Sequence, residues 1–305
     1  MMTSRLPHIL SIVVNEPLMV HPGKAKAFMI GLGGRLVEGG VVFGDDGISA
    51  VNHNVGDSMG KLTDQIGRAY DRAGRAPYEV VDNVAVIPVE GTLVHKGAYI
   101  GQSSGQTSYE GLQAQIIRAG KDDRVKGIVY EFDTFGGVVN GAFATAELMR
   151  RVSAQKPTMA ILTDNAASAG YLLASQQRQI VMPTHGTTGS IGVVTMHADF
   201  SKKLENEGVR VTILTAGSHK ADGNEFEPLP DEVRERILAR AERTRQTFAA
   251  AVEAGRGRRL TAAQALATQG ATFDDSEALK LGLIDAVAYP NDAFAEFVAA
   301  VNRAR

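Results

Sequence analysis

The sequence has no cysteine among its 305 residues. Disulfide bonds, cysteine nucleophiles and thiolate metal sites are therefore excluded, and the absence fits a reducing compartment. Neither sign of charge is in excess, because 32 basic and 34 acidic residues leave a formal net charge of -2. Such a balance gives no overall field that would mark the chain for nucleic acid or an anionic membrane. The absence of cysteine thus leaves only catalytic mechanisms that need no thiol.

Long hydrophobic runs are also missing. No stretch reaches the roughly 18 consecutive apolar residues that a membrane-spanning helix needs. The apolar stretch 9–14 is shorter than the core of a signal peptide, and no small-residue cleavage pattern follows it. We therefore expect a soluble, cytoplasmic protein without a membrane anchor.

Several motifs of known chemistry are absent as well. No P-loop occurs, and no His-Glu-x-x-His pattern or carboxylate cluster predicts a metal site. None of the seven histidines lies in a Gly-x-Ser-x-Gly nucleophile elbow. His219 stands beside the candidate residue Lys220, where a loop or substrate-lining role is the simpler interpretation. We expect no metal and no cofactor.

The chain has room for one large domain with an appendage, since 44% of its residues are hydrophobic. Residues 1–80 contain apolar segments broken by prolines and glycines, which predict an N-terminal appendage of short helices and a turn-rich hairpin. From residue 81 onward, apolar runs alternate with helical periodicity. We expect the main domain to span residues 81–290 and a C-terminal helix to span residues 291–305.

The main domain is predicted to be an α/β core of parallel β-α units, because strands and helices alternate along it. Strands are expected at 84–91, 127–133, 158–163, 209–215 and 283–287, and near Ile180 and Val193. Helices are expected from a capping box at 107–110, over 141–152, after Ser168, over 231–254 and from a second capping box at 261–264. The basic cluster Arg256–Arg259 is interpreted as a solvated loop.

Ser168 stands in Asn165-Ala-Ala-Ser-Ala-Gly-Tyr171, between a predicted strand and a predicted helix. A nucleophile at this point would meet exposed backbone amides and the positive end of the helix dipole, which stabilise an oxyanion. The simpler interpretation is a helix N-cap, because serine is a preferred residue there. This segment alone leaves both interpretations open.

Three further segments carry a similar ambiguity. Gly136 and Gly137 follow a predicted strand and could donate their amides to an oxyanion, but paired glycines also occur in plain turns. Lys220 lies in a loop, where lysines are usually solvated, whereas a general base needs burial that brings its pKa down from about 10.4. Ser190, in the segment Gly189-Ser-Ile-Gly192, could partner such a lysine or belong to a tight turn.

The order of these segments resembles peptidase family S49. A Gly-Gly pair follows one strand, Ser168 follows the next, and Gly-Ser-Ile-Gly and Gly-x-x-Lys come after it. The family contains signal peptide peptidase A and phage capsid proteases, and the resemblance covers roughly residues 83–290. It implies a ClpP/crotonase-like core.

The resemblance also implies a role for each residue. Ser168 matches the nucleophile of the family, Lys220 its general base and Ser190 the serine that orients the lysine. Ala169 stands where the family has glycine, and its amide still allows an oxyanion hole with Gly137.

The resemblance also bears on Gly136 and on the residues that follow Lys220. Gly136 is a further candidate donor to the oxyanion. The family often has an acidic residue directly after the lysine, whereas here Ala221 and then Asp222 follow it. This difference concerns the hydrogen bonding of the loop.

The expected function follows from the branch of the family. The missing membrane anchor favours the branch of phage minor capsid protein C, so we expect a serine endopeptidase that cleaves scaffold or capsid proteins in the host cytoplasm or procapsid. The family also implies a ring-like or otherwise closed homo-oligomer, and it leaves open whether serine and lysine come from one chain or from adjacent chains.

Three alternatives remain open. They are a soluble protease like signal peptide peptidase A, a non-catalytic scaffold-binding assembly protein on the same fold, and a crotonase-like acyl-CoA enzyme. The acyl-CoA enzyme would leave the Ser/Lys pair without a purpose.

Overall fold

The computed structural model describes residues 17–20, 64–97, 99–103 and 105–303. Its strands are β1 (Leu18–Val20), β2 (Glu79–Val81), β3 (Val84–Glu90), β4 (Thr92–Val94), β5 (Gln102–Ser103), β6 (Gln106–Ser108), β7 (Gly127–Thr134), β8 (Gly136–Val138), β9 (Thr158–Ala167), β10 (Gln179–Met182), β11 (Thr187–Gly189), β12 (Thr272–Phe273) and β13 (Ala286–Val287). Its helices are α3 (Gln65–Arg72), α4 (Tyr109–Lys121), α5 (Ala142–Gln155), α6 (Ala169–Ala174), α7 (Ser201–Asn206), α8 (Asp231–Arg256), α9 (Ala262–Ala267), α10 (Asp275–Leu281) and α11 (Pro290–Arg303). No helix in these ranges is long and apolar enough to cross a membrane.

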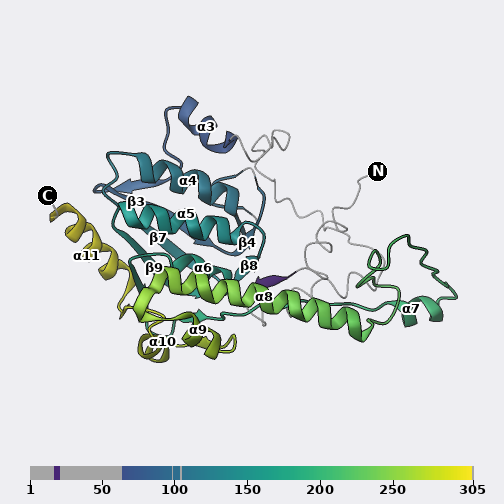
Figure 1. The fold of residues 1–305 in the computed structure, drawn as a ribbon. Coiled ribbons are helices and arrows are strands. Elements are labelled where there is room, and N and C mark those ends of the chain that lie inside the picture. The colour runs from purple at the N-terminus through teal and green to yellow at the C-terminus, as the bar shows by residue number, and fades with distance from the viewer. Residues whose placement is uncertain (1–16, 21–63, 98, 104, 304–305) are drawn as a thin grey trace.

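The main sheet confirms the predicted α/β core. Its strands have the order β12-β11-β9-β7-β3-β2, and β10 with β13 joins it beside β9. β3, β7 and β9 run parallel, with Val84 opposite Gly127 and Ile128 opposite Thr158. α4 and α5 form the crossovers between these strands (Figure 1). Apolar runs form such strands because both faces of a parallel sheet are covered.

Successive side chains of each strand point to opposite faces of the sheet, and each face carries a hydrophobic cluster. In β7, Tyr130 and Phe132 belong to the larger cluster, which includes residues of α4, α5, α6 and α8. Val129 belongs to a smaller cluster with Phe297 and Val301 of α11. The expected C-terminal helix therefore covers the opposite face from α4, α5, α6 and α8.

A second, smaller sheet stands at the carboxyl ends of β3 and β7. Its order is β1-β8-β4-β6-β5, and β4 and β8 follow β3 and β7 almost directly in the chain. β8 is flanked on both sides, because Gly137 is the register partner of Met19 in β1 and of Leu93 in β4. Ligand sites of parallel α/β sheets lie at this edge.

The predicted capping box at 107–110 is wrong in its details. Ser108 is the N-cap of α4, and its hydroxyl accepts a hydrogen bond from the amide of Gly111 at 3.0 Å. Thr107 instead belongs to β6 and donates to the carbonyl of Glu90. The second capping box is confirmed, with Thr261 as the N-cap of α9.

Two predicted strands are absent. The chain near Val193 has no regular strand, because β11 ends at Gly189 and the backbone turns at Ser190. Residues 209–215 also pair with no strand in the described chain, and Leu214 is 89% exposed. High β-propensity forms no strand without a neighbour to pair with.

The segment without the predicted strand is part of an arm, which we define as residues 201–240. It consists of α7, the connection to α8 and the N-terminal part of α8. The arm extends beyond the sheet at the far end of α8 (Figure 1). In α8, four of the five buried residues lie in the last third of the helix, which packs on the core.

The interpretation of the basic cluster as a solvated loop is wrong for Arg256. Its side chain is fully buried at the end of α8 and forms a salt bridge with Asp285, with an N–O distance of 2.7 Å. It also donates to the carbonyl of Gly282 at 2.8 Å. Arg259 is partly exposed and reaches the same carboxylate at 3.0 Å. The pair ties α8 to the segment before β13.

The predicted domain boundary at residue 80 stays a prediction, because most of residues 1–80 lie outside the described ranges. In the described part, β1 lies in the core, with Met19 fully buried. β2 and β3 form a hairpin through Asp82 and Asn83. Both have positive φ, 46° and 67°, as a two-residue type I′ turn requires.

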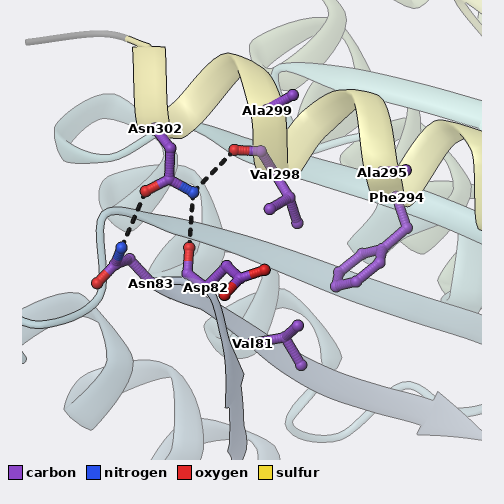
Figure 2. A pocket seen from close by; sticks show the side chains of 8 residues that line it. All are labelled: Val81, Asp82, Asn83, Phe294, Ala295, Val298, Ala299 and Asn302. Atoms are coloured by element: carbon purple, nitrogen blue, oxygen red, sulfur yellow. Dashed lines mark hydrogen bonds between the residues drawn. The ribbon is translucent and has the colours of Figure 1, made fainter.

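A pocket lies between this turn and α11 (Figure 2). Asn83 donates its side-chain amide to the Oδ1 of Asn302 at 2.9 Å, and Asn302 donates to the carbonyl of Asp82 at 2.7 Å. These bonds hold the end of α11 on the turn. None of the residues that line the pocket belongs to the predicted site.

Candidate active site

Ser168 lies between the end of β9 and the start of α6, as predicted. Its φ is 56° and its ψ is −120°, a strained conformation that costs a residue with a side chain about 1–3 kcal/mol. The residue is 1% exposed, and its Oγ is buried without a hydrogen-bond partner. It occupies the N-cap position of α6 but makes no side-chain cap bond. A capping role alone therefore does not explain this serine.

Ser190 lies next to Ser168 because β9 and β11 are paired. Ala167 and Gly189 are register partners, and the amide of Ser168 donates to the carbonyl of Gly189 at 2.9 Å. Ser190 also has positive φ, 54°, and is buried. Its amide donates to the carbonyl of Ala271 at 2.7 Å. Two buried, strained serines therefore follow adjacent parallel strands.

The backbone of Gly136 passes close to the start of α6. Its φ is 95°, and a Cβ on this residue would lie 2.9 Å from the amide nitrogen of Ala169 and 2.2 Å from the carbonyl oxygen of Met19. The Ala169 amide is the first of α6 and has no acceptor within the helix. The amide of Gly136 donates to the Oγ1 of Thr134 at 3.1 Å, so it is already engaged.

Gly137 is confined by its neighbours in the small sheet. A Cβ on this residue would lie 1.9 Å from the carbonyl oxygen of Leu93, a distance that backbone atoms cannot tolerate. Only a residue without a side chain lets β4 and β8 come this close. The glycine pair is thus required by close backbone packing beside Ser168.

Thr134 organises this loop, a role that the sequence motifs do not predict. Its hydroxyl donates to the carbonyl of Gly91 and accepts from the amide of Gly136. Its methyl carbon lies 2.5 Å from the position of a Cβ on Gly170, so α6 packs directly on it. Its place at the end of a strand, two residues before the glycine pair, was the available signal.

Tyr171 fastens α6 to the C-terminal part of the domain. Its hydroxyl is buried and donates to the carbonyl of Leu283 at 2.9 Å. Burial raises the pKa of Tyr171, which keeps the hydroxyl protonated and able to donate. The helix that follows Ser168 is therefore held at its first turn.

Lys220 is not brought to Ser168 within one chain. It lies on the arm and is exposed, and the hydroxyl of Ser168 has no hydrogen-bond partner. The turn around it is held by Asp222, which contacts the ring of His219 at 3.2 Å and forms a salt bridge with Arg236 of α8. The acidic residue two positions after the lysine thus fixes this turn to α8.

The predicted site residues fall into two groups. Ser168, Ala169, Ser190 and the Gly136–Gly137 pair meet at the carboxyl edge of the sheet. Lys220 and His219 belong to the arm, and both are exposed. One chain therefore holds the candidate nucleophile and oxyanion amides together, but not the candidate base.

Comparisons with known proteins agree with the family resemblance. Residues 150–303 match the sequence profile of Peptidase family S49. The chain is 38% identical to the capsid assembly protease C of Escherichia phage lambda, over 94% of this chain and 64% of that protein. It is 34% identical to a head-tail preconnector protein of Enterobacteria phage P21, over 99% of this chain and 59% of that protein.

One solved structure with a similar chain path is an enoyl-CoA hydratase/isomerase family protein from Silicibacter pomeroyi. Its sequence is 17% identical to this chain, and the match has a TM-score of 0.43 and covers 73% of this chain and 80% of that chain.

The chain spans about three fifths of the length of the two phage relatives. The family profile extends from within α5 to the end of α11, half of the sequence, and includes the strand that ends just before Ser168. The chain therefore belongs to peptidase family S49.

Proposed function

We propose that the protein is a serine endopeptidase with Ser168 as nucleophile and Lys220 as general base. The observation that carries this proposal is the buried, unbonded hydroxyl of Ser168, held in a strained conformation at the start of α6. Strain of this kind gathers at functional sites. Membership of the S49 family supports the same assignment.

The reaction is hydrolysis of a peptide bond in two steps. Neutral Lys220 takes the proton of the Ser168 hydroxyl while Oγ attacks the carbonyl carbon, and the leaving amine then receives that proton. Water, deprotonated by the same lysine, attacks the acyl-enzyme and releases the carboxyl product with Ser168 restored. Ser190 orients the lysine amine.

Backbone amides stabilise the tetrahedral oxyanion in this proposal. Ala169 is the better-supported donor, because its amide is the first of α6 and receives no helix acceptor. Gly137 is the second donor. Gly136 contributes by its shape, since its amide is bonded to Thr134.

The base comes from a neighbouring chain. Lys220 is exposed on the arm, and a lysine acts as a base near neutral pH only when burial removes water from its amine. The arm also exposes apolar side chains, among them Leu214 and Leu238. Contact with a second chain would cover these side chains and place the lysine beside Ser168.

The biological role follows from the names of the two phage relatives. We infer that the protein acts in assembly of a phage or prophage head and cleaves scaffold or capsid proteins in the host cytoplasm or procapsid. Residues 81–290 would form the protease domain, whose sheets also include β1 and β2 from the preceding region, and the rest of residues 1–80 would form an appendage.

Cleavage of an unstructured protein tests the activity. We expect wild-type protein to cut dye-labelled casein, and Ser168→Ala to lose at least about 1,000-fold in rate because no nucleophile remains. Ser103→Ala, at an exposed serine of β5, is the matched control and should cut normally. A wild-type oligomer that cuts nothing, or a Ser168→Ala protein that cuts at the wild-type rate, would favour a scaffold-binding role instead.

Replacement of the second oxyanion donor is expected to slow cleavage. In Gly137→Ala the new Cβ collides with the backbone of Leu93, so β8 has to move away from β4. A displacement near 1 Å at reacting groups costs about 100-fold in rate. Gly120→Ala, in helix α4, is the control. Its new Cβ would meet a side-chain methyl group of Val152 at 3.1 Å and no backbone atom, so only a side chain has to adjust. The cleavage rate of this variant should stay within about twofold of the wild-type rate. Equal rates for both variants would remove Gly137 from the site.

A further inference from the structure

The strand β1 uses both of its edges. On one side it pairs antiparallel with β8, with Leu18 opposite Val138. On the other side Leu18 exchanges two hydrogen bonds of 2.9 Å with Val194, which follows the Ser190 turn. In Figure 1 the short purple arrow lies beside β8. Three residues therefore fill the space between the loop of Gly136 and the segment after Ser190.

The carbonyl of Met19 faces the proposed oxyanion donors. Successive carbonyls of a strand point to opposite edges, and both backbone groups of Leu18 face Val194. Those of Met19 therefore face β8, where Gly137 is its register partner. The position of a Cβ on Gly136 is 2.2 Å from the Met19 oxygen and 2.9 Å from the Ala169 nitrogen, so both atoms border the same small space.

This arrangement leaves no edge for a substrate at β8. Extended peptides bind many proteins by adding a strand to a free sheet edge. β8 already has β4 on one side and β1 on the other, and the hydroxyl of Ser168 is buried. A substrate can pair with β8 beside Ser168 only where β1 now lies.

We propose that Leu18–Val20 is a built-in pseudosubstrate that occupies the peptide-binding cleft and has to leave before another peptide is cut. The proposal rests on the proposed function of Ser168. It also defines the ligand: an extended peptide, antiparallel to β8, with an apolar side chain at the position of Met19, which is fully buried.

A reversible lock tests this proposal. The chain has no cysteine, so Leu18→Cys with Val194→Cys creates a single disulfide. Antiparallel partners that exchange both hydrogen bonds have Cα atoms about 5.5 Å apart, which suits a disulfide. With the disulfide closed, two rates should fall at least about tenfold: cleavage of casein, and labelling of Ser168 by a fluorophosphonate. A loss of about tenfold is expected when β1 is held in more than nine tenths of the clefts. Reduction should restore them.

Leu18→Cys alone is the control and should not respond to the reductant. Equal rates in the closed and reduced states would overturn the proposal, because β1 would then be a permanent wall of the site. If wild-type protein shows neither cleavage nor labelling, the proposed function fails instead, and the following binding experiment still decides about the cleft.

Binding of the chain's own segment gives that second readout. A fluorescent peptide with the sequence of residues 15–22 is titrated into Ser168→Ala protein with and without Met19→Asp. The carboxylate cannot stay in a fully buried place, so β1 should leave, and the peptide should bind at least about tenfold more tightly. Met19→Leu keeps an apolar side chain and should bind like the parent. Unchanged affinity in a folded Met19→Asp protein contradicts the proposal, and if that variant does not fold, the disulfide lock decides.

Discussion

Two inactive variants, Ser168→Ala and Lys220→Ala, should recover activity when they assemble together. Each alone is expected to lose at least about 1,000-fold in cleavage rate, because one lacks the nucleophile and the other the base. In a mixed oligomer a Lys220→Ala chain supplies the serine, and its Ser168→Ala neighbour supplies the lysine. Random assembly at equal amounts completes about a quarter of the sites, so about a quarter of the wild-type rate should return.

The expectation derives from the position of the two residues. Ser168 lies in the core beside Ser190, and its amide is bonded to the carbonyl of Gly189. Lys220 lies on the exposed arm, in a turn that Asp222 ties to α8 through Arg236. Because the turn is anchored to the arm, the whole arm has to meet a second chain for the lysine to reach a serine.

The two variants are coexpressed with different tags, purified as mixed oligomers and assayed with dye-labelled casein. Native mass spectrometry verifies that both chains are present. The control replaces Lys220→Ala by a double variant with both changes, which leaves no intact serine and should recover nothing. Verified mixed oligomers without activity would mean that the dyad forms within one chain, and normal activity of Lys220→Ala alone would exclude the lysine as base.

The main elements of the fold could be predicted because their apolar residues have to be buried, and this requirement leaves a clear pattern in the sequence. Apolar runs such as 127–133 become β7, since a parallel strand is covered on both faces. The amphipathic helix over 231–254 becomes α8 for a similar reason. The pattern of 209–215 is equally apolar, but no strand pairs with it within the described chain. Strand formation there depends on a partner that local sequence does not specify.

The candidate site could be predicted in part. The end of a strand followed by Ser168 and small residues indicates an exposed helix N-terminus, and the structure has that arrangement. The engagement of the Gly136 amide depends on the rotamer of Thr134, which no spacing reveals. β1 has only three residues, too few for a period of two to be recognised, and its pairing partner lies more than a hundred residues away. Contacts of this kind follow from tertiary structure alone.

Asp285→Asn should strongly destabilise the fold, although the residue lies outside the site. The Arg256 side chain is fully buried, and both of its terminal nitrogens donate to the Asp285 carboxylate, at 2.7 and 3.0 Å. The carboxylate also accepts from the amide of Ile180 at 2.8 Å. Removing one partner of a buried pair leaves an uncompensated charge and costs about 3–5 kcal/mol of the free energy of unfolding.

Urea denaturation at pH 7 measures this loss. Asp123→Asn, at an exposed position, is the matched control and should change the free energy of unfolding by less than about 0.5 kcal/mol. Adding Arg256→Met to Asp285→Asn removes the stranded charge, so the double variant should be more stable than Asp285→Asn alone. A double variant that is less stable than the single one would show that the arginine acts through packing and not through its charge.

The pH dependence supplies an independent check on the same pair. Burial alone would raise the pKa of Asp285, but the hydrogen bonds and charge of Arg256, with the Ile180 amide and Arg259, outweigh it and lower this pKa below its usual value. A carboxyl group with a lowered pKa in the folded state stabilises the protein above its unfolded pKa of about 3.9, and this contribution disappears as the pH falls through the folded pKa. The stability difference between wild type and Asp285→Asn should therefore be constant near neutral pH and shrink below about pH 4, because wild-type Asp285 is then protonated as well. A difference that stays the same down to the acid limit of folding would mean that the carboxylate charge does not hold Arg256 in place.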